Sequence, residues 1–277
     1  MKRFQVDKSL CVQCGECVRD CVFGLITMEQ GYPVLPADKE SICIDCQHCL
    51  AVCKPGAVSI LGLDPADSLP LDGELPDKGQ MELLIKGRRS VRYFKPDPLP
   101  EETVDELLRI AAHAPTGVNV RGVEFIVVED RVTMEGIRQE TMEALQELAS
   151  RDAIPDNLSV LKKMLPLMER GKDPIFREAP HLLIASAANH VPCREADVYI
   201  ALSYFELLAS SAGIGTTWCG LGKWALVDLA PHVLHKFGVP KNHDVAYLML
   251  FGMPDVEYYR TVQRDKDIKI RRLRLVT

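Results

Sequence analysis

The sequence predicts an α+β protein with a small cysteine-rich domain followed by a larger domain of helices and buried strands. Three observations predict this organisation. Eight of the 10 cysteines fall within residues 11–53. Proline, glycine and aspartate then interrupt residues 64–79, as in a linker. Beyond the linker, helically spaced apolar positions alternate with uninterrupted apolar runs. We place the domains at 1–62 and 80–277, with a linker at 63–79 that holds their spacing.

The cysteines of the first domain repeat one spacing, C-x2-C-x2-C-x3-C. The two copies are Cys11, Cys14, Cys17 and Cys21, then Cys43, Cys46, Cys49 and Cys53. This spacing is typical of [4Fe–4S] clusters, because three thiolates on a tight loop reach three irons of a cube and the fourth cysteine ligates the other cluster. We therefore expect one cluster at Cys11, Cys14, Cys17 and Cys53, and a second at Cys43, Cys46, Cys49 and Cys21.

A zinc site and a disulfide framework are the alternatives to two clusters. Zinc sites favour C-x2-C pairs separated by a longer loop, unlike these dense runs. Disulfides suit a short secreted chain, and the first residues lack the apolar segment of a signal peptide. Residues 1–62 thus resemble the two-cluster ferredoxin module of bacteria. Val22 and Lys54 depart from that module, which commonly has proline directly after the fourth cysteine.

Composition excludes several classes of function. The net charge of −6 gives no basic footprint for nucleic acid or anionic lipid. No run approaches the roughly 18–20 apolar residues that span a bilayer. Free thiols and clusters persist best in a reducing compartment, so we expect a cytoplasmic protein without nucleic-acid or membrane partners.

Periodicity and breakers place the elements of the second domain in order. Helices are predicted around 81–86, from 101 onward, within 131–178, over 194–212 before Gly213, and over 226–237 before Gly238. Buried strands are predicted at 125–128, 180–187 and 245–251. The alternating tail at 268–275 predicts an edge strand or an arm.

Three segments of this domain carry candidate binding residues. After Gly87, the residues Arg88, Arg89, Ser90 and Arg92 form an anion trap, because guanidinium and hydroxyl groups donate to phosphate. A stray basic loop is the alternative. The second segment is Ala114-Pro115-Thr116-Gly117-Val118-Asn119. The third, residues 213–220, is glycine-rich and would let backbone approach a flat ring closely.

These segments, in this order, resemble the nitroreductase family of FMN flavoproteins over about residues 80–265. The second segment is similar to the family's A-P-S-x-x-N, and residues 213–220 to its G-L-G-x-x-W-x-G. Gly252-Met253-Pro254 and the arginines that follow resemble its G-x-P and phosphate-binding residues. The resemblance implies a nitroreductase-like FMN fold, in which a mixed sheet is flanked by helices. It also implies a homodimer with FMN at the subunit interface.

The resemblance assigns cofactor-binding roles residue by residue. Arg92 would lie near flavin N1 and O2 as a cation that tunes the ring, and no side chain is assigned as an obligatory catalytic group. The other residues implied to contact FMN are Arg88, Arg89, Ser90, Pro115, Thr116, Asn119, Cys219, Gly220, Leu221, Arg260 and Arg264. Among the arginines of the tail, Arg260 is the first choice for the phosphate and Arg264 the second.

Three residues are left with two interpretations. Arg121 replaces a glutamine of the family and either faces the substrate or is a solvated loop arginine. Cys219 is either a redox thiol or, the better interpretation, a small buried hydrophobe. Cys193 is expected to be buried in the same way.

We expect electrons to pass from the clusters through FMN to an electron-poor organic acceptor, such as a nitroaromatic, a quinone or an enone. The donor would be ferredoxin or NAD(P)H. One alternative is reductive dehalogenation, since dehalogenating relatives share a similar R-R-S-V-R segment. Another is an electron-transfer relay between protein partners, without a small-molecule substrate of its own.

Overall fold

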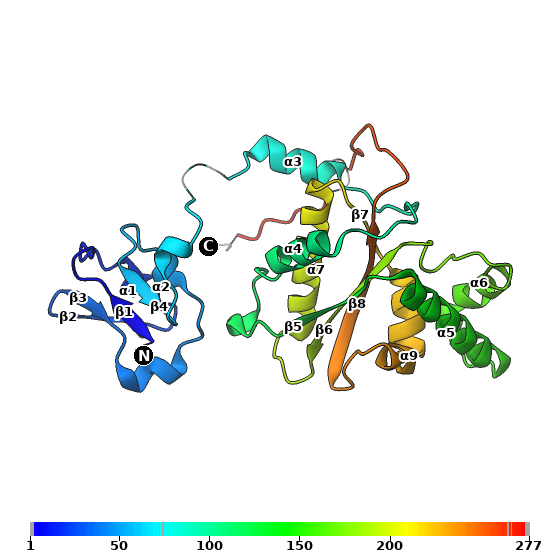
Figure 1. Ribbon diagram of the computed structural model, residues 1–277, viewed down its shortest axis with the longest axis horizontal. Coiled ribbons are helices and arrows are strands. Elements are labelled where there is room, and N and C mark those ends of the chain that lie inside the picture. The colour runs from blue at the N-terminus through cyan, green and yellow to red at the C-terminus, as the bar shows by residue number, and fades with distance from the viewer. Residues whose placement is uncertain (1–2, 72, 74, 265, 267, 275–277) are drawn as a thin grey trace. The chain divides into compact units, whose positions relative to one another are not determined.

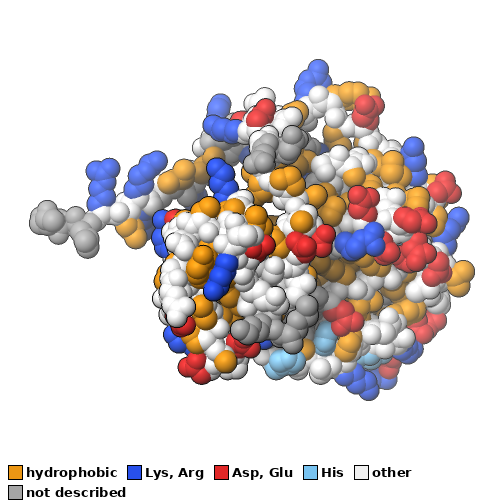
Figure 2. Space-filling model, turned by 60° about the vertical axis from the view of Figure 1, so that its left-hand side comes forward, with side chains coloured by type: hydrophobic (Ala, Val, Ile, Leu, Met, Phe, Trp, Pro, Cys, Tyr) orange, Lys and Arg blue, Asp and Glu red, His pale blue; other side chains and the backbone are white. Residues whose placement is uncertain are grey.

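The computed structural model describes residues 3–71, 73, 75–264, 266 and 268–274. The chain divides into two compact units, Met1–Leu75 with Val118–Val120 and Pro76–Gly117 with Arg121–Thr277. Each unit has its own buried apolar residues. Within the described ranges, no helix is both long enough and apolar enough to cross a membrane. On the face of the molecule shown in Figure 2, acidic and basic side chains are interspersed.

The first unit is built from short elements around two cysteine loops. Strands β1 (Phe4–Val6) and β4 (Val58–Ile60) pair antiparallel, as do β2 (Thr27–Glu29) and β3 (Tyr32–Val34). Single-turn helices α1 (Glu16–Arg19) and α2 (His48–Ala51) each begin within one cysteine motif. The remaining elements are the 3-10 turns η1 (Ala37–Ile42) and η2 (Pro65–Asp67).

The two cysteine loops have the same backbone conformation. Gln13 and Asp45 occupy equivalent positions and have φ angles of 58° and 59°. Gly15 and Gln47, just before the two short helices, have φ angles of 74° and 59°. These left-handed residues turn each loop back on itself, and in the first loop Cys11, Cys14 and Cys17 line one cavity. The repeat seen in the sequence is therefore a repeat in structure.

The second unit contains a four-stranded sheet in the order β5-β6-β8-β7, with all neighbouring strands antiparallel. The strands are β5 (Val123–Val128), β6 (His181–Ala188), β7 (Gly215–Trp218) and β8 (His243–Gly252). A parallel bridge from Ser90 to Thr216 adds the segment before Val91 to the outer edge of β7. The sheet is therefore mixed, and the predicted α+β class is confirmed.

Helices cover both faces of this sheet (Figure 1). One face packs against α5 (Arg131–Ser150), α6 (Val160–Met168), the π-helix η5 (Lys223–Leu229) and α9 (Pro231–Lys236). The other face packs against α4 (Glu101–Ala111) and α7 (Arg194–Ser211). Alternate residues of β6 serve the two cores, Ile184 on the first face and Leu183 on the second. This burial of both faces explains why β6 is an uninterrupted apolar run.

Local sequence signals account for several helix ends. Helix α3 (Lys78–Gly87) begins with a capping box in which Asp77 and Gln80 bind each other's backbone N–H groups. Helix α4 follows Pro100 and has acids in its first turn. Helix α7 is followed by Gly213 in the left-handed conformation, with φ 74°. The remaining short elements are η3 (Gly117–Asn119), η4 (Asp156–Leu158) and α8 (Gly220–Gly222).

One prediction about the C-terminal third is wrong, and one of the two alternatives for the tail is excluded. The single helix predicted over 226–237 is two elements, because Ala230 leaves the helical region and Pro231 starts a new helix. Proline has no N–H for the preceding turn, so it favours the first position of a helix. No strand forms at residues 268–274, and Leu275 lies outside the described residues.

Candidate cofactor sites

Four cysteines of the first unit line one small cavity, together with apolar residues such as Pro55 and Val58. They are Cys11, Cys14, Cys17 and Cys53. These are the four that the spacing assigns to one cluster, three from the first motif and one from the end of the second.

The last cysteine of each motif accepts a backbone hydrogen bond. Leu25 N donates to Cys21 Sγ at 3.4 Å, and Ala57 N donates to Cys53 Sγ at 3.2 Å. Hydrogen bonds to cluster sulfurs are one of the factors that set a cluster's potential. The two bonds occupy equivalent positions, so both predicted cluster sites share this feature.

Two cysteines at the centre of the loops are buried, Cys17 at 7% exposure and Cys49 at 6%. Burial raises the pKa of the Cys17 thiol to about 11 and that of Cys49 to about 12. Both sites therefore favour the protonated thiol, unless iron displaces the proton. Within the described residues, no three side chains of His, Cys, Asp or Glu are close enough for a single metal ion. A cubane cluster spreads its four thiolates around a larger object, so its ligands need not converge on one point.

The first predicted flavin segment is held between two other parts of the second unit. Val91 N donates to Thr216 O at 2.9 Å, and Thr217 Oγ1 donates to Val91 O. Gly215 permits this approach, since a Cβ there would lie 2.7 Å from Val91 Cγ2. The segment is therefore built onto the edge strand β7 rather than left as a free loop.

On its other side this segment meets the chain that leaves the sheet after β8. Lys95 N donates to Met253 O at 2.8 Å, and Asp255 N donates to Tyr93 O at 2.9 Å. Farther along, Tyr258 Oη is 3.5 Å from Ser90 O. Two residues after Tyr258 comes Arg260, which is exposed, as is Arg264. The backbone thus brings the first segment and the arginine-bearing tail together.

The arginines of the first segment differ in their surroundings. Arg88 Nη1 donates to Glu206 Oε1 at 2.8 Å, and the two side chains are 22% and 10% exposed. Arg92 is exposed, and its Nη1 donates to Ser90 O at 3.3 Å. Arg89 is half-buried. Arg88 is thus the fixed cation of the set, and Arg92 the one most open to solvent.

The second predicted segment contains a sharp backbone turn. Val118, Asn119 and Arg121 have φ angles of 45°, 55° and 52°, in the left-handed region. Thr116 Oγ1 accepts from Arg121 N at 2.9 Å, and Pro115 precedes it. Asn119 belongs to the first unit, where its Nδ2 donates to Ile44 O at 2.8 Å. Arg121 contributes a backbone donor to this turn, while its own side chain is exposed.

Gly117, in the same segment, contacts the first turn of α7. Its N–H donates to Asp197 Oδ1 at 2.9 Å, while a Cβ at Gly117 would lie 2.5 Å from Cys193 Sγ. Only glycine fits here. Cys193 itself is exposed, so the expectation that it is a buried hydrophobe is wrong. It precedes α7, and its side chain lies against a loop instead of entering the core.

The third predicted segment, Cys219 to Leu221, follows β7. Cys219 is 3% exposed, its Sγ donates to Ile175 O at 3.5 Å, and burial raises its pKa to about 12. A thiol that stays protonated at neutral pH is a poor nucleophile. Cys219 is therefore a packing group, and Gly222 is small because a Cβ there would lie 2.7 Å from Cys219 Sγ.

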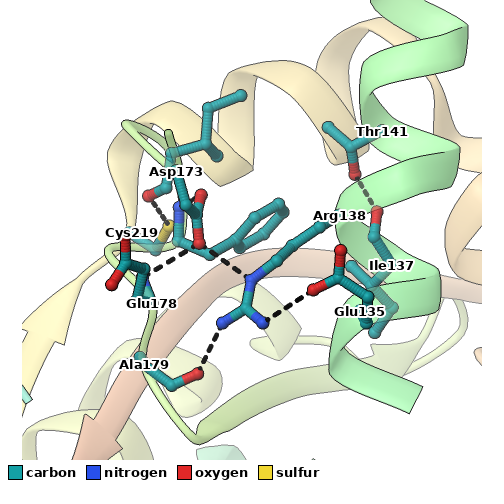
Figure 3. Close-up of polar contacts among 10 residues, drawn as sticks. Glu135, Ile137, Arg138, Thr141, Asp173, Glu178, Ala179 and Cys219 are labelled. Carbon is teal, nitrogen blue, oxygen red and sulfur yellow. Dashed lines mark hydrogen bonds and ion pairs between the residues drawn. The ribbon is translucent and has the colours of Figure 1, made fainter. Parts of the chain in front are cut away.

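Arg138 of α5 holds the loop of residues 173–179, whose Ile175 O accepts the Cys219 hydrogen bond (Figure 3). The Arg138 guanidinium donates to Asp173 Oδ2 at 2.8 Å, to Ala179 O at 2.9 Å and to Glu135 Oε2 at 3.3 Å. Asp173 in turn accepts from Phe176 N at 2.8 Å. This network holds the backbone that Cys219 contacts, and so it stabilises the position of the third segment.

A cavity of the second unit has none of the predicted cofactor residues in its lining. It has a volume of about 740 Å³, lies beside the start of α7, and its lining includes Tyr199, Lys223 and Asp244. Four of its charged groups form two ion pairs, Lys223 with Asp228 at 2.7 Å and Arg194 with Asp244. We assign no ligand to it.

Sequence reasoning missed the residues that hold the predicted segments in place. These are Asp197, Glu206, Thr216 and Thr217. A signal was present for the two acids, because each stands between apolar residues of α7 and buried carboxylates need a partner. No comparable signal marked the threonines, which are ordinary residues for a strand.

Comparisons with known proteins agree with this architecture. Residues 85–253 match the model of the nitroreductase family, and residues 10–58 match that of the 4Fe-4S dicluster domain. An iodotyrosine deiodinase of Thermotoga neapolitana is 28% identical over 134 residues, which cover 48% of this chain and 69% of that protein. Nitroreductase NfnB of Mycolicibacterium smegmatis is 30% identical over 161 residues, 49% of this chain and 68% of that one.

A solved structure shows the same fold. A nitroreductase with bound FMN from Bacteroides fragilis superimposes with a TM-score of 0.56 at 24% identity, covering 71% of this chain and 100% of that one. The family match spans more than half of the chain, and the dicluster match spans all eight clustered cysteines. The chain therefore belongs to the nitroreductase family of oxidoreductases and carries a 4Fe-4S dicluster domain at its N-terminal end.

Proposed function

We propose that this chain is an FMN-dependent oxidoreductase that reduces an electron-poor organic molecule with electrons supplied through two [4Fe–4S] clusters. The acceptor class is a nitroaromatic, a quinone or an enone. The observation that carries the proposal is the presence of a dicluster domain and a nitroreductase domain in one polypeptide. Bound FMN supplies a centre that accepts single electrons and donates pairs, which suits one-electron donors upstream.

The donor set of the second unit fits a flavin phosphate. Arg88 and Ser90 offer a guanidinium group and a hydroxyl within three residues, and Arg260 follows the segment that meets Ser90. Such forked donors are the usual partners of phosphate. Arg92, as an exposed cation beside this set, is proposed to lie at the ring and to favour its reduced, negatively charged form. Pro115, Thr116 and Asn119, with the backbone of residues 219–221, are proposed to contact the ring.

We further propose a cytoplasmic homodimer with FMN at the subunit interface. Large apolar side chains remain exposed around the first segment, including Leu83 at 67% and Tyr93 at 71%. Burying such side chains against a second subunit would stabilise a dimer. Sedimentation of the FMN-loaded protein tests the oligomeric state, and a monomer at micromolar concentration would contradict it.

The test of the function is an anaerobic titration followed in the visible spectrum. NADH, NADPH and reduced ferredoxin are added separately, and a nitrobenzene or a benzoquinone is then added to the reduced protein. We expect ferredoxin to bleach the flavin band and the acceptor to restore it. If NADH or NADPH alone bleaches the flavin, the clusters would accept electrons from the flavin rather than deliver electrons to it. Without any flavin band, the proposal of an FMN site in the second unit is wrong.

Two alternatives make different predictions in the same experiment. Reductive dehalogenation is favoured by the similarity to an iodotyrosine deiodinase. Release of iodide from iodotyrosine by the reduced protein, faster than nitro reduction, would favour it. A relay between proteins would leave the reduced flavin stable toward every small acceptor, with reoxidation only by an electron-accepting protein.

A further inference from the structure

Helix α7 carries two buried acids that face different predicted flavin segments. Asp197 is 2% exposed and Glu206 is 8% exposed, among otherwise apolar neighbours such as Val198 and Phe205. Burying a carboxylate is unfavourable unless it is paired or hydrogen-bonded. Each acid therefore marks a place where the fold needs a fixed acceptor, and both partners, Arg88 and Gly117, lie in segments expected at the cofactor.

Glu206 fixes Arg88 without consuming its capacity to bind phosphate. The contact is a single bond from Nη1 to Oε1 at 2.8 Å, and Thr216 Oγ1 lies 3.5 Å from the same oxygen. A guanidinium has five N–H donors, so this bond leaves a fork of donors for an incoming anion. Thr216 also carries the backbone bond to Val91. Glu206 thus ties the side chain of Arg88 to the same strand that holds the segment's backbone.

Asp197 acts on the second segment through the backbone. Its Oδ1 accepts from Gly117 N at 2.9 Å, and its Oδ2 has no partner among the described residues. One turn earlier on the chain, Cys193 lies where any side chain at Gly117 would have to go. The start of α7 is therefore shaped around this loop by a hydrogen bond and by close packing.

We propose that Asp197 and Glu206 are positioning residues that pre-orient the two flavin-binding segments from one rigid helix. Glu206 sets Arg88 for the phosphate, and Asp197 sets the backbone of residues 114–117 for the ring. This inference rests on the proposed FMN site. Preorganised groups bind more tightly because less ordering accompanies binding.

The test compares two ligands, because riboflavin has the ring of FMN but no phosphate. Dissociation constants of both are measured on the apoprotein of the full chain by quenching of flavin fluorescence. For Glu206→Leu we expect FMN to bind about tenfold more weakly, with riboflavin unchanged. Glu206→Gln keeps an oxygen acceptor and should restore most of the affinity. For Asp197→Leu we expect both ligands to weaken by a similar factor.

Each acid serves as the control for the other, and Glu195→Leu on the same helix should change neither constant. Glu206→Leu in an Arg88→Leu background should have no further effect, because positioning acts through Arg88. Circular dichroism of each variant checks folding, and Glu206→Gln remains informative if Glu206→Leu fails to fold. Equal weakening of FMN and riboflavin by Glu206→Leu, or full additivity with Arg88→Leu, would overturn the inference. If the unmodified protein binds neither ligand, the proposed function itself fails.

Discussion

The two units of this chain are held together in different ways. The first unit has a small apolar core, and two of its buried members are the predicted cluster ligands Cys17 and Cys49. The second unit buries apolar side chains on both faces of a sheet, with residues such as Ile184 and Leu183 fully buried. Small domains bury too little apolar surface to be stable alone and use metals as a substitute. The first unit should therefore depend on its cofactor, and the second should exist as a scaffold before it binds one.

Removing a buried cluster ligand should have the largest effect. Cys17→Ser or Cys49→Ser deletes a thiolate at the centre of the first unit, where metal binding and folding are coupled. We expect loss of iron and loss of amide protection throughout residues 3–60, with the second unit unchanged. Hydrogen exchange on the anaerobic full chain measures the protection of both units, and an iron assay of the same sample measures the loss of iron. Cys193→Ser, outside both motifs, is the control, and persistent protection in the Cys17 variant would contradict the comparison.

A cavity created in the sheet should destabilise the second unit and leave the first unit unchanged. Ile184 is 0% exposed in the middle of β6, and Ile184→Ala should destabilise the second unit by about 2–5 kcal/mol. Iron content and the protection of the first unit should not change. Urea unfolding followed by tryptophan fluorescence reports on this unit, since Trp218 and Trp224 both lie in it. Val132→Ala, at an 83% exposed position, should have little effect. A parallel loss of iron would show that the units are not independent.

Acid should weaken the second unit through His181. This residue is buried, its Nε2 accepts from Leu99 N at 2.7 Å, and its Nδ1 faces Val128 O at 3.2 Å. Burial lowers its pKa in the folded state below the usual 6.5. The unfolded chain therefore binds the proton more readily, and stability is full above pH 6.5 and falls as the pH decreases below it. The loss is at most about 1.4 kcal/mol per pH unit.

The measurement is urea unfolding of the second unit between pH 7.5 and pH 5, with and without His181→Gln. The substitution should remove most of this pH dependence, although it also lowers stability overall. An unchanged slope would assign the acid sensitivity to other groups.

The smallest effect should come from a difference between the two cysteine loops. Gln47 has a φ of 59° where the first loop has Gly15 at 74°. A left-handed conformation costs about 1 kcal/mol more for glutamine than for glycine. Gln47→Gly should therefore stabilise the iron-loaded first unit by about 1 kcal/mol, and Gly15→Ala should destabilise it similarly. Thermal unfolding under anaerobic conditions checks both, and equal responses of opposite sign would support the repeat.

Sequence reasoning succeeded where one physical requirement dictates the residues. Cluster ligation fixes cysteine spacing, so both motifs were visible directly. Burial on two faces makes β6 an unbroken apolar run, and its predicted range, 180–187, nearly matches His181–Ala188. Gly213 marks the end of α7, because glycine readily adopts the left-handed conformation that follows many helices.

It failed where the outcome depends on tertiary contacts. The turn at Ala230 separates η5 from α9, and no local residue except Pro231 signals it. Cys193 was expected in the core because free cysteines usually are buried, but its position before α7 places it at the surface. The partners of Asp197 and Glu206 lie far away in the sequence, so their roles are visible only in the fold.

The path of the chain through the second unit also has a mechanical consequence. The chain enters the sheet at Ser90, bridged to Thr216, and leaves it at Pro254, bridged to Phe94. Tension applied between Ser90 and Pro254 therefore loads these few bridges directly. The segment expected to bind the cofactor is therefore also one that transmits mechanical load through the second unit. A phosphate bound to it would add a further connection.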